Sequence, residues 1–334
     1  MEDYQSLFIE LLKRHMPSHS HMAEELSDLL GLSVDSVYRR LRGDTSITLT
    51  EAVKICLHYN IPLDALSAED SNAVNFTINR LTDDPETFIT YLSGLHQAIK
   101  RANAYENRQM IYAAEDLPVF YHFFLPHLAH FKSVYWTKSI LNLPQVQLKK
   151  VEQIETPPEW KDIVNGIGRE FLDLPTIEIW NEDTMKSTLQ QIKFYWEAGF
   201  FQEKQTALDI IEDLQKLVNC MQLQAELGRK VHPGKMQATS TPYQLYVSDL
   251  MIGNNTVSLN ANETKTTFIG YNTFNYMQTK NAFFSQNVQG WLDNFISKST
   301  LISAVAEKQR NQFFKKRMQH VIELYQFIEN DYSL

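Results

Sequence analysis

The sequence predicts a multidomain chain, with an all-α N-terminal domain of five short helices and an α/β C-terminal domain with a mixed sheet and long helices. Within residues 1–66, apolar side chains recur at spacings of three and four, which is typical of helices that bury one face. From residue 106 onward, short apolar runs typical of strands are interrupted by helical stretches. The 334 residues, 43% of them hydrophobic, are sufficient for more than one packed core.

Apolar stripes predict the first two helices. The first stripe is formed by Tyr4, Leu7, Phe8, Leu11, Leu12 and His15. The second helix carries Leu26, Leu29 and Leu30 on one face, and the small Ser27 between them lets a neighbouring helix approach closely. Gly31 then ends this helix, because glycine adopts the left-handed conformation without steric cost and can turn the chain within a few residues.

A third helix is expected to begin after Ser33, a favourable N-cap residue, and to close at Gly43. Its inward face is expected to comprise Val34, Val37, Tyr38 and Leu41. Its outward face is expected to comprise Asp35, Ser36, Arg39, Arg40 and Arg42. Two short helices around one glycine, followed by exposed arginines, form the helix-turn-helix arrangement that presents a helix to the DNA major groove.

Two further helices complete the predicted N-terminal domain, residues 1–66. Thr48 and Glu51 form a capping box for the fourth helix. The residues expected to point inward from that helix are Leu49, Ala52, Val53, Cys56 and Leu57. Pro62 is suited to the first turn of a helix and begins a fifth one, which ends at Leu66.

Residues 67–105 are predicted to be a linker and a connecting helix. The linker is indicated by the polar stretches AEDSN and TDDP, and the helix by an inward stripe from about Glu86 to Arg101. Residues 106–334 form the predicted α/β sensor or assembly domain. Its strands are expected at 110–114, 176–180, 243–250, 256–260 and 266–271, and its helices after 185, over about 202–227, around 291–295 and over 304–329.

The first 66 residues resemble the phage-repressor-like (Xre, or Cro/repressor-type) helix-turn-helix family. The matching features are the Leu26, Ser27, Leu30 and Gly31 run, the Leu32-Ser33 turn, Val37, the arginine-rich end before Gly43 and the IPLDAL tail. Two features depart from the family pattern, because Ser27 replaces the usual alanine and Arg40-Leu41 replaces an apolar-Glu pair. The resemblance covers roughly a fifth of the chain.

The resemblance implies that residues 33–42 form a recognition helix in the major groove of a double-stranded DNA operator. The expected base-contacting residues are Ser33, Asp35, Ser36, Arg39 and Arg40. The expected phosphate-contacting residues are Ser20, His21 and Arg42. Arginine suits the first role because it can donate two parallel hydrogen bonds to guanine O6 and N7. Asp35 and Ser36 can accept from cytosine or bond a phosphate.

The overall charge predicts weak non-specific DNA binding. The chain has 31 Lys+Arg against 40 Asp+Glu, a formal net charge of −9, and non-specific affinity scales with the phosphates that basic residues neutralise. A single domain of this kind should bind poorly. We therefore expect a homodimer that contacts two half-sites about one helical turn apart.

Several other classes of protein and site are not expected. Cys56 and Cys220 lie in apolar helical stretches, which is typical of buried thiols in a reducing compartment. No apolar run is long enough to span a membrane, and the first residues, MEDYQ, are too acidic for a signal peptide. The sequence therefore predicts a cytoplasmic protein with no membrane partner. The GIG at 166–168 is too short for a phosphate loop. His122, His127 and His130 share a helical side, but partly buried histidines among phenylalanines explain them better than a metal site does. We expect no cofactor, no metal and no enzymatic activity.

The order of elements after residue 106 is similar to that of the non-catalytic phospholipase D-like effector domains of some transcription regulators. The catalytic motif of that family is only partly echoed by His130-Phe131-Lys132, because Thr137 stands where an aspartate belongs. The aromatic clusters at 194–196 and 200–201 could line a ligand pocket, although such clusters are more often core.

The sequence is therefore interpreted as a sequence-specific transcriptional regulator. Its C-terminal domain is expected to sense a small-molecule or protein effector, or to mediate oligomerisation, and an effector would shift the population between two dimer geometries. The last helix has a stripe that suits either packing within the domain or self-association: Phe314, Met318, Val321, Tyr325 and Ile328. An enzyme fused to a repressor-like domain and an antitoxin-like scaffold remain as alternatives.

Overall fold

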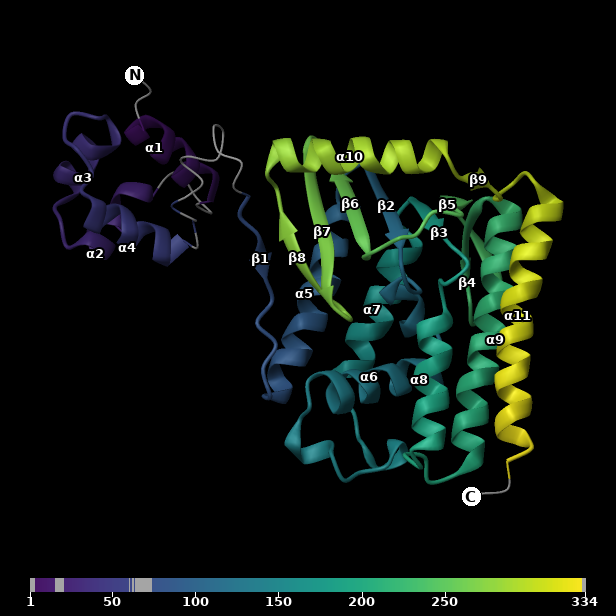
Figure 1. The fold of residues 1–334 in the computed structure, drawn as a ribbon. Helices are drawn as coiled ribbons and strands as arrows, with labels where there is room; N and C mark the ends of the chain where they lie inside the picture. Colours follow the sequence, from purple (N-terminus) through teal and green to yellow (C-terminus); the bar gives the residue numbers. More distant parts are fainter. Residues whose placement is uncertain (1–3, 16–20, 60, 62, 64–73, 332–334) are drawn as a thin grey trace. The chain divides into compact units, whose positions relative to one another are not determined.

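The structure, a computed structural model, describes residues 4–15, 21–59, 61, 63 and 74–331. The chain divides into two compact units, Met1–Phe76 and Thr77–Leu334, which are considered separately below. Figure 1 shows that unit 1 is helical and that unit 2 combines a mixed sheet with long helices, as the sequence predicts.

Unit 1 contains four described α-helices around a small core. They are α1 (Tyr4–His15), α2 (Met22–Leu30), α3 (Val34–Leu41) and α4 (Leu49–Tyr59). The buried side chains of the core come from all four helices and the segment after α4: Phe8, Leu12, Met22, Ala23, Leu26, Val37, Ile55, Cys56 and Ile61. The fifth helix expected from Pro62 to Leu66 lies largely outside the described residues.

Two of the predicted inward faces in unit 1 are wrong in part. In α3, Val37 is buried as expected, but Val34 and Tyr38 are 38% and 50% exposed. In α4, Ile55 and Cys56 point into the core, whereas the large aliphatic residues expected there are exposed: Leu49, Val53 and Leu57. The reason is that α4 carries two apolar stripes at helical spacing, and only the one facing α2 and the other core helices finds partners.

The described residues of unit 2 form a nine-stranded mixed sheet. The strands are β1 (Thr77–Ile78), β2 (Arg108–Ala114), β3 (Thr176–Trp180), β4 (Arg229–His232), β5 (Gln237–Val247), β6 (Thr256–Ala261), β7 (Thr264–Asn272), β8 (Asn275–Thr279) and β9 (Thr300–Leu301). Their order is β1-β8-β7-β6-β2-β3-β5-β4, with β9 paired to β5. The central pairs β2–β3 and β3–β5 are parallel, and the remaining pairs are antiparallel.

Helices cover both faces of this sheet (Figure 1). The α-helices are α5 (Pro85–Asn103), α6 (Pro126–Tyr135), α7 (Trp160–Leu172), α8 (Lys186–Glu197), α9 (Lys204–Leu227), α10 (Ala282–Ser297) and α11 (Glu307–Glu329). Shorter helical segments occur at η2 (Val119–Phe123), η3 (Trp136–Ile140), η4 (Pro144–Val146) and η5 (Val151–Gln153), of which η3 is a π-helical turn. Along β2, Ile111 and Ala113 face α10, whereas Met110 and Tyr112 face the larger core formed with α5, α7 and α9.

Most of the elements expected in unit 2 are confirmed. β3 has the predicted bounds, and α9 ends at Gly228, which has φ of 62°. The connecting helix expected near Glu86 is α5, which lies within unit 2 and packs against α7. β1, β4, β8 and β9 were not predicted, since each is short or irregular in pattern and is recognisable only by its pairing.

The stripe on the last helix packs inside unit 2. Phe314, Val321 and Ile328 are buried in the large core, and α11 lies along α9 (Figure 1). Arg310 and Arg317 of the same helix are also buried and donate hydrogen bonds to backbone carbonyls. The packing explanation is therefore the one that the structure supports. None of the helices in the described part of the chain is both long and apolar enough to cross a membrane.

Candidate nucleic-acid interface

The turn between α2 and α3 follows the predicted local chemistry. Gly31 has φ of 68° and ψ of 35°, so it occupies the left-handed region that glycine adopts without strain. The backbone N–H of Leu32 donates to the carbonyl of Ser27 at 3.1 Å, and the Ser27 hydroxyl donates to the Leu32 carbonyl. Ser27 thereby fixes both sides of the turn, a contribution that its small size alone did not suggest.

α3 begins at a defined N-cap. The Ser33 hydroxyl accepts a hydrogen bond from the backbone N–H of Ser36 at 3.3 Å, and the two hydroxyl oxygens lie 2.9 Å apart. Val37 is 1% exposed and anchors the helix in the core. Because this anchor occupies one side of an eight-residue helix, the opposite side is left to solvent.

The solvent-facing side of α3 brings together Val34, Asp35, Tyr38 and Arg39. Asp35 and Arg39 form an exposed ion pair of 3.1 Å, one helical turn apart. Val34 and Tyr38 were not predicted to lie here, and apolar side chains are the kind that contact the methyl group of thymine. The short length of α3 could have indicated their exposure, since one buried residue is enough to anchor two turns.

Arg40 is placed differently from the other two predicted arginines. Its Nε donates to Glu51 Oε2 at 3.1 Å, one terminal nitrogen donates to Glu51 Oε1 at 2.9 Å, and the other donates to the Ser36 carbonyl at 3.2 Å. The Arg40 and Glu51 side chains are only 16% and 15% exposed. Arg40 therefore joins α3 to α4 in this structure and does not point outward as the sequence predicts.

Glu51 has two roles at this junction. It completes the predicted capping box, because its Oε2 accepts from the Thr48 N–H at 2.8 Å while Thr48 Oγ1 accepts from the Glu51 N–H at 3.3 Å. Its hydrogen bond from Arg40 is the largest cause that lowers the pKa of its carboxyl group. The carboxylate thus stays charged and holds the loop between α3 and α4 as well as the start of α4.

Gln5 of α1 secures the same loop and was not expected to matter. Its Nε2 donates to the carbonyls of Arg40 and Thr45 at 3.0 and 2.9 Å, and its Oε1 accepts from the Ile47 N–H at 3.0 Å. The sequence gives no signal for this role, because the partners are more than 30 residues away.

The residues expected at phosphates lie at the ends of the helices. His21, the residue before α2, is exposed and has Nδ1 3.1 Å from Glu24 Oε2. Arg42 follows α3, is exposed, and pairs with Asp44 at 2.9 Å. Ser20 lies outside the described residues. His21 and Arg42 each already contact a carboxylate, so binding of a phosphate by either side chain requires an exchange of partners.

The other candidate sites from the sequence lie in unit 2. His122 is buried, and burial lowers its pKa well below the usual range. His130 contacts the Val151 carbonyl, and Lys132 is buried against Thr188 and Gln191. In the aromatic clusters, Tyr195, Trp196 and Phe201 are core residues. No group of three potential metal ligands occurs among the described residues.

The glycines at 166 and 168 have a structural explanation. They lie inside α7, and a Cβ atom added at Gly166 would come within 2.4 Å of the His96 ring on α5. A Cβ at Gly168 would lie 3.1 Å from the Phe124 ring. The two glycines therefore permit close packing of neighbouring side chains on α7.

Comparison with known proteins bears on unit 1 and the first residues of unit 2. Residues 6–88, about a quarter of the chain, match the family model of the BetR domain. No curated protein and no solved structure matches the chain. The BetR domain is a helix-turn-helix-like DNA-binding domain, and the match covers α2, the turn at Gly31 and α3. The N-terminal part of this chain is thus similar to a DNA-binding domain, which indicates a helix-turn-helix regulator.

Proposed function

We propose that this chain is a sequence-specific transcriptional regulator that binds a double-stranded DNA operator as a homodimer through α3. The observation that carries the proposal is the outward side of α3, where Asp35, Tyr38 and Arg39 are exposed on a helix anchored by Val37. The match of residues 6–88 to the BetR domain supports the same role. The proposal contains no catalytic step.

The exposed side chains are assigned different contacts. Arg39 donates hydrogen bonds to guanine. Asp35 and Ser36, together with Ser33 at the start of the helix, bond the neighbouring cytosine or a phosphate. Val34 and Tyr38 contact the methyl groups of thymine. His21 and Arg42 contact phosphates. Arg40 supports α3 through Glu51 in the free protein, and its contribution to base recognition is indirect.

Two features support the homodimer. The acidic balance of the chain, −9 overall, makes a single α3 contact weak. In addition, α4 carries an exposed apolar face formed by Leu49, Val53 and Leu57. Contiguous exposed apolar patches often mark surfaces that bind another protein. We propose that unit 2 senses an effector that shifts the dimer between two geometries.

The proposal is tested by selecting bound duplexes from a random pool with the full chain. We expect an enriched inverted repeat with half-site centres about 10 base pairs apart. Arg39→Ala should lose about 1–3 kcal/mol of discrimination at one guanine of each half-site. It should keep its stability, because its ion pair with Asp35 is exposed.

Arg169→Ala is the matched control, because it removes one exposed positive charge from α7 in unit 2. Equal selectivity of Arg39→Ala and the wild-type protein would remove Arg39 from base recognition. Failure of the full chain to enrich any duplex would contradict the proposed function.

A further inference from the structure

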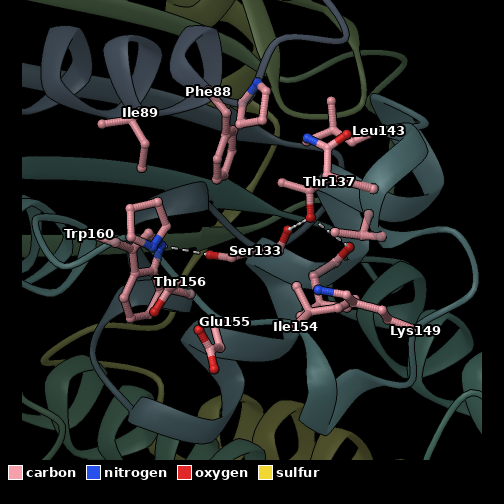
Figure 2. Close-up of a pocket in the computed structure, with 15 residues that line it drawn as sticks. Phe88, Ile89, Ser133, Thr137, Leu143, Lys149, Ile154, Glu155, Thr156 and Trp160 are labelled. Atoms are coloured by element: carbon pink, nitrogen blue, oxygen red, sulfur yellow. Dashed lines mark hydrogen bonds between the residues drawn. The ribbon is translucent and has the colours of Figure 1, made fainter.

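Unit 2 contains a mostly apolar pocket of about 190 Å³ between α5, the α6–η3 segment and the start of α7. Its apolar walls are formed mainly by Phe88, Val134, Leu143, Val146, Ile154 and Trp160. Figure 2 shows Phe88 reaching toward the middle of the pocket, with Trp160 on one side and Leu143 on the other. An apolar cavity of about 150 Å³ can hold a benzene molecule. The pocket is therefore large enough for one six-membered ring or a branched aliphatic group.

Hydrogen bonds hold one wall of the pocket in place. The Trp160 indole N–H donates to Ser133 Oγ at 2.9 Å, and the Ser133 hydroxyl donates to the Ala129 carbonyl at 3.0 Å. Thr137 Oγ1 donates to the Ser133 carbonyl at 2.8 Å (Figure 2). These polar groups are occupied with one another, so this wall presents a preformed apolar surface.

The opposite wall is fixed by a buried ammonium group. Lys138 lies in the π-helical turn η3, a kind of distortion that often occurs at functional sites. Its Nζ donates to the carbonyls of Val146 and Lys149 at 3.2 and 3.0 Å and also to that of Gln147. Burial lowers the pKa of this ammonium group. Three carbonyls tied to one cation keep the segment 146–149 in position beside the cavity.

Two opposite charges lie at the pocket without protein partners. Lys149 and Glu155 both line the pocket and are exposed. Within the described residues, the Lys149 and Glu155 side chains form no ion pair and no hydrogen bond. A monoanionic ligand would meet one matching and one repelling charge here. A ligand that carries both charges would match both.

We propose that this pocket binds a small zwitterion with an apolar side group, of which a hydrophobic α-amino acid is the simplest example. The side group occupies the cavity between Phe88 and Trp160, the carboxylate lies at Lys149, and the ammonium group lies at Glu155. This inference deepens the proposed function, because it assigns a chemical class and a site to the effector.

Binding is measured on the full chain without DNA, by titration calorimetry and the fluorescence of Trp160 and its neighbours. The probes are L-phenylalanine and L-leucine, with 3-phenylpropionate and phenethylamine as analogues that each lack one charge. We expect saturable binding of at least one amino acid, and weaker binding of both analogues. Equal binding of an analogue and L-phenylalanine, or no binding of either amino acid, would overturn the proposal.

Three variants locate the site. Lys149→Gln and Glu155→Gln change exposed side chains and should each weaken binding of the amino acid about tenfold. Val134→Phe fills the cavity and should abolish binding. Lys235→Gln, an exposed lysine that does not line the pocket, is the control and should bind as the wild type does. Unchanged affinity in both Lys149→Gln and Glu155→Gln would also overturn the assignment.

A separate measurement distinguishes this inference from the proposed function. Operator affinity is measured with and without a saturating concentration of the bound amino acid. Binding without any effect on operator affinity supports the pocket and contradicts effector control of DNA binding. A chain that binds no operator but binds the amino acid supports the pocket alone.

Discussion

The Arg40–Glu51 pair provides the sharpest prediction about unit 1. Arg40→Ala removes two hydrogen bonds to Glu51 and one to the Ser36 carbonyl, and leaves a carboxylate that is only 15% exposed without its cation. Fully exposed pairs contribute about 0.2–1 kcal/mol, and truncating one partner of a fully buried pair costs about 3–5 kcal/mol. The intermediate exposure places the expected cost at about 1.5–2 kcal/mol.

Glu51→Ala should cost more than Arg40→Ala. The additional loss is that of the capping box with Thr48, and caps contribute about 1 kcal/mol. The double variant Arg40→Ala/Glu51→Ala should lose less stability than the two single variants lose in total. The difference, which is the coupling energy, should be about 1–2 kcal/mol. This coupling is the quantity that measures the bridge between α3 and α4.

The assay exploits the distribution of tryptophan. All five tryptophans, at 136, 160, 180, 196 and 291, lie in unit 2. Urea unfolding followed by circular dichroism therefore reports on both units, whereas tryptophan fluorescence reports on unit 2. The variants should shift the helical signal of unit 1 and leave the fluorescence transition unchanged. Hydrogen exchange of α3 and α4 peptides gives an independent measurement of the same loss.

The pH dependence adds a second readout of the same pair. The pKa of Glu51 is lowered chiefly by its hydrogen bond from Arg40. The pair therefore stabilises unit 1 above the unfolded pKa of the carboxyl group, and this contribution is lost as pH falls through the folded pKa. Glu51→Gln should remove this pH-dependent contribution to the stability of unit 1. A coupling energy below about 0.5 kcal/mol would refute the argument. An Arg40→Ala protein that keeps wild-type stability but loses operator selectivity would also refute it.

Two further predictions concern unit 2. Burial lowers the pKa of Lys132 from 10.5 to about 8. Between about pH 8 and pH 10.5 the folded state therefore binds fewer protons than the unfolded state, so the free energy of unfolding rises with pH. Lys132→Met should make this rise shallower in fluorescence-monitored urea unfolding, and an unchanged slope would contradict the assignment. Gly166→Ala should destabilise unit 2 by about 1 kcal/mol, because its Cβ would overlap the His96 ring. In a His96→Ala background the same change should instead stabilise α7 by about 0.5–1 kcal/mol, and a penalty that persists there would exclude the proposed clash.

Local chemistry explains the features that the sequence predicts well. Gly31, Ser33 and the Thr48–Glu51 capping box act within a few residues of themselves, and the structure places each as expected. β3 and the end of α9 at Gly228 follow for the same reason. Turns, caps and strong periodicities depend on the neighbouring chain and therefore remain visible without tertiary contacts.

Burial and pairing were decided by contacts that are distant in the sequence. The apolar residues of α4 recur on two faces of the helix, and either face could be buried. Packing against α1, α2 and α3 buries Ile55 and Cys56 and leaves Leu49 and Leu57 exposed. Arg40 looks like an exposed arginine until Glu51, eleven residues away, is brought beside it. The pocket under Phe88 likewise combines α5 with segments some 45 to 75 residues further along the chain.

The sequence by itself therefore determined that a short helix follows a glycine turn and carries polar and basic side chains. The tertiary structure decided which of these side chains remain exposed, how the sheet is ordered, and where unit 2 leaves a cavity. The physical reason is that caps and turns are satisfied by adjacent backbone, whereas burial, ion pairing and cavities depend on which distant surfaces meet.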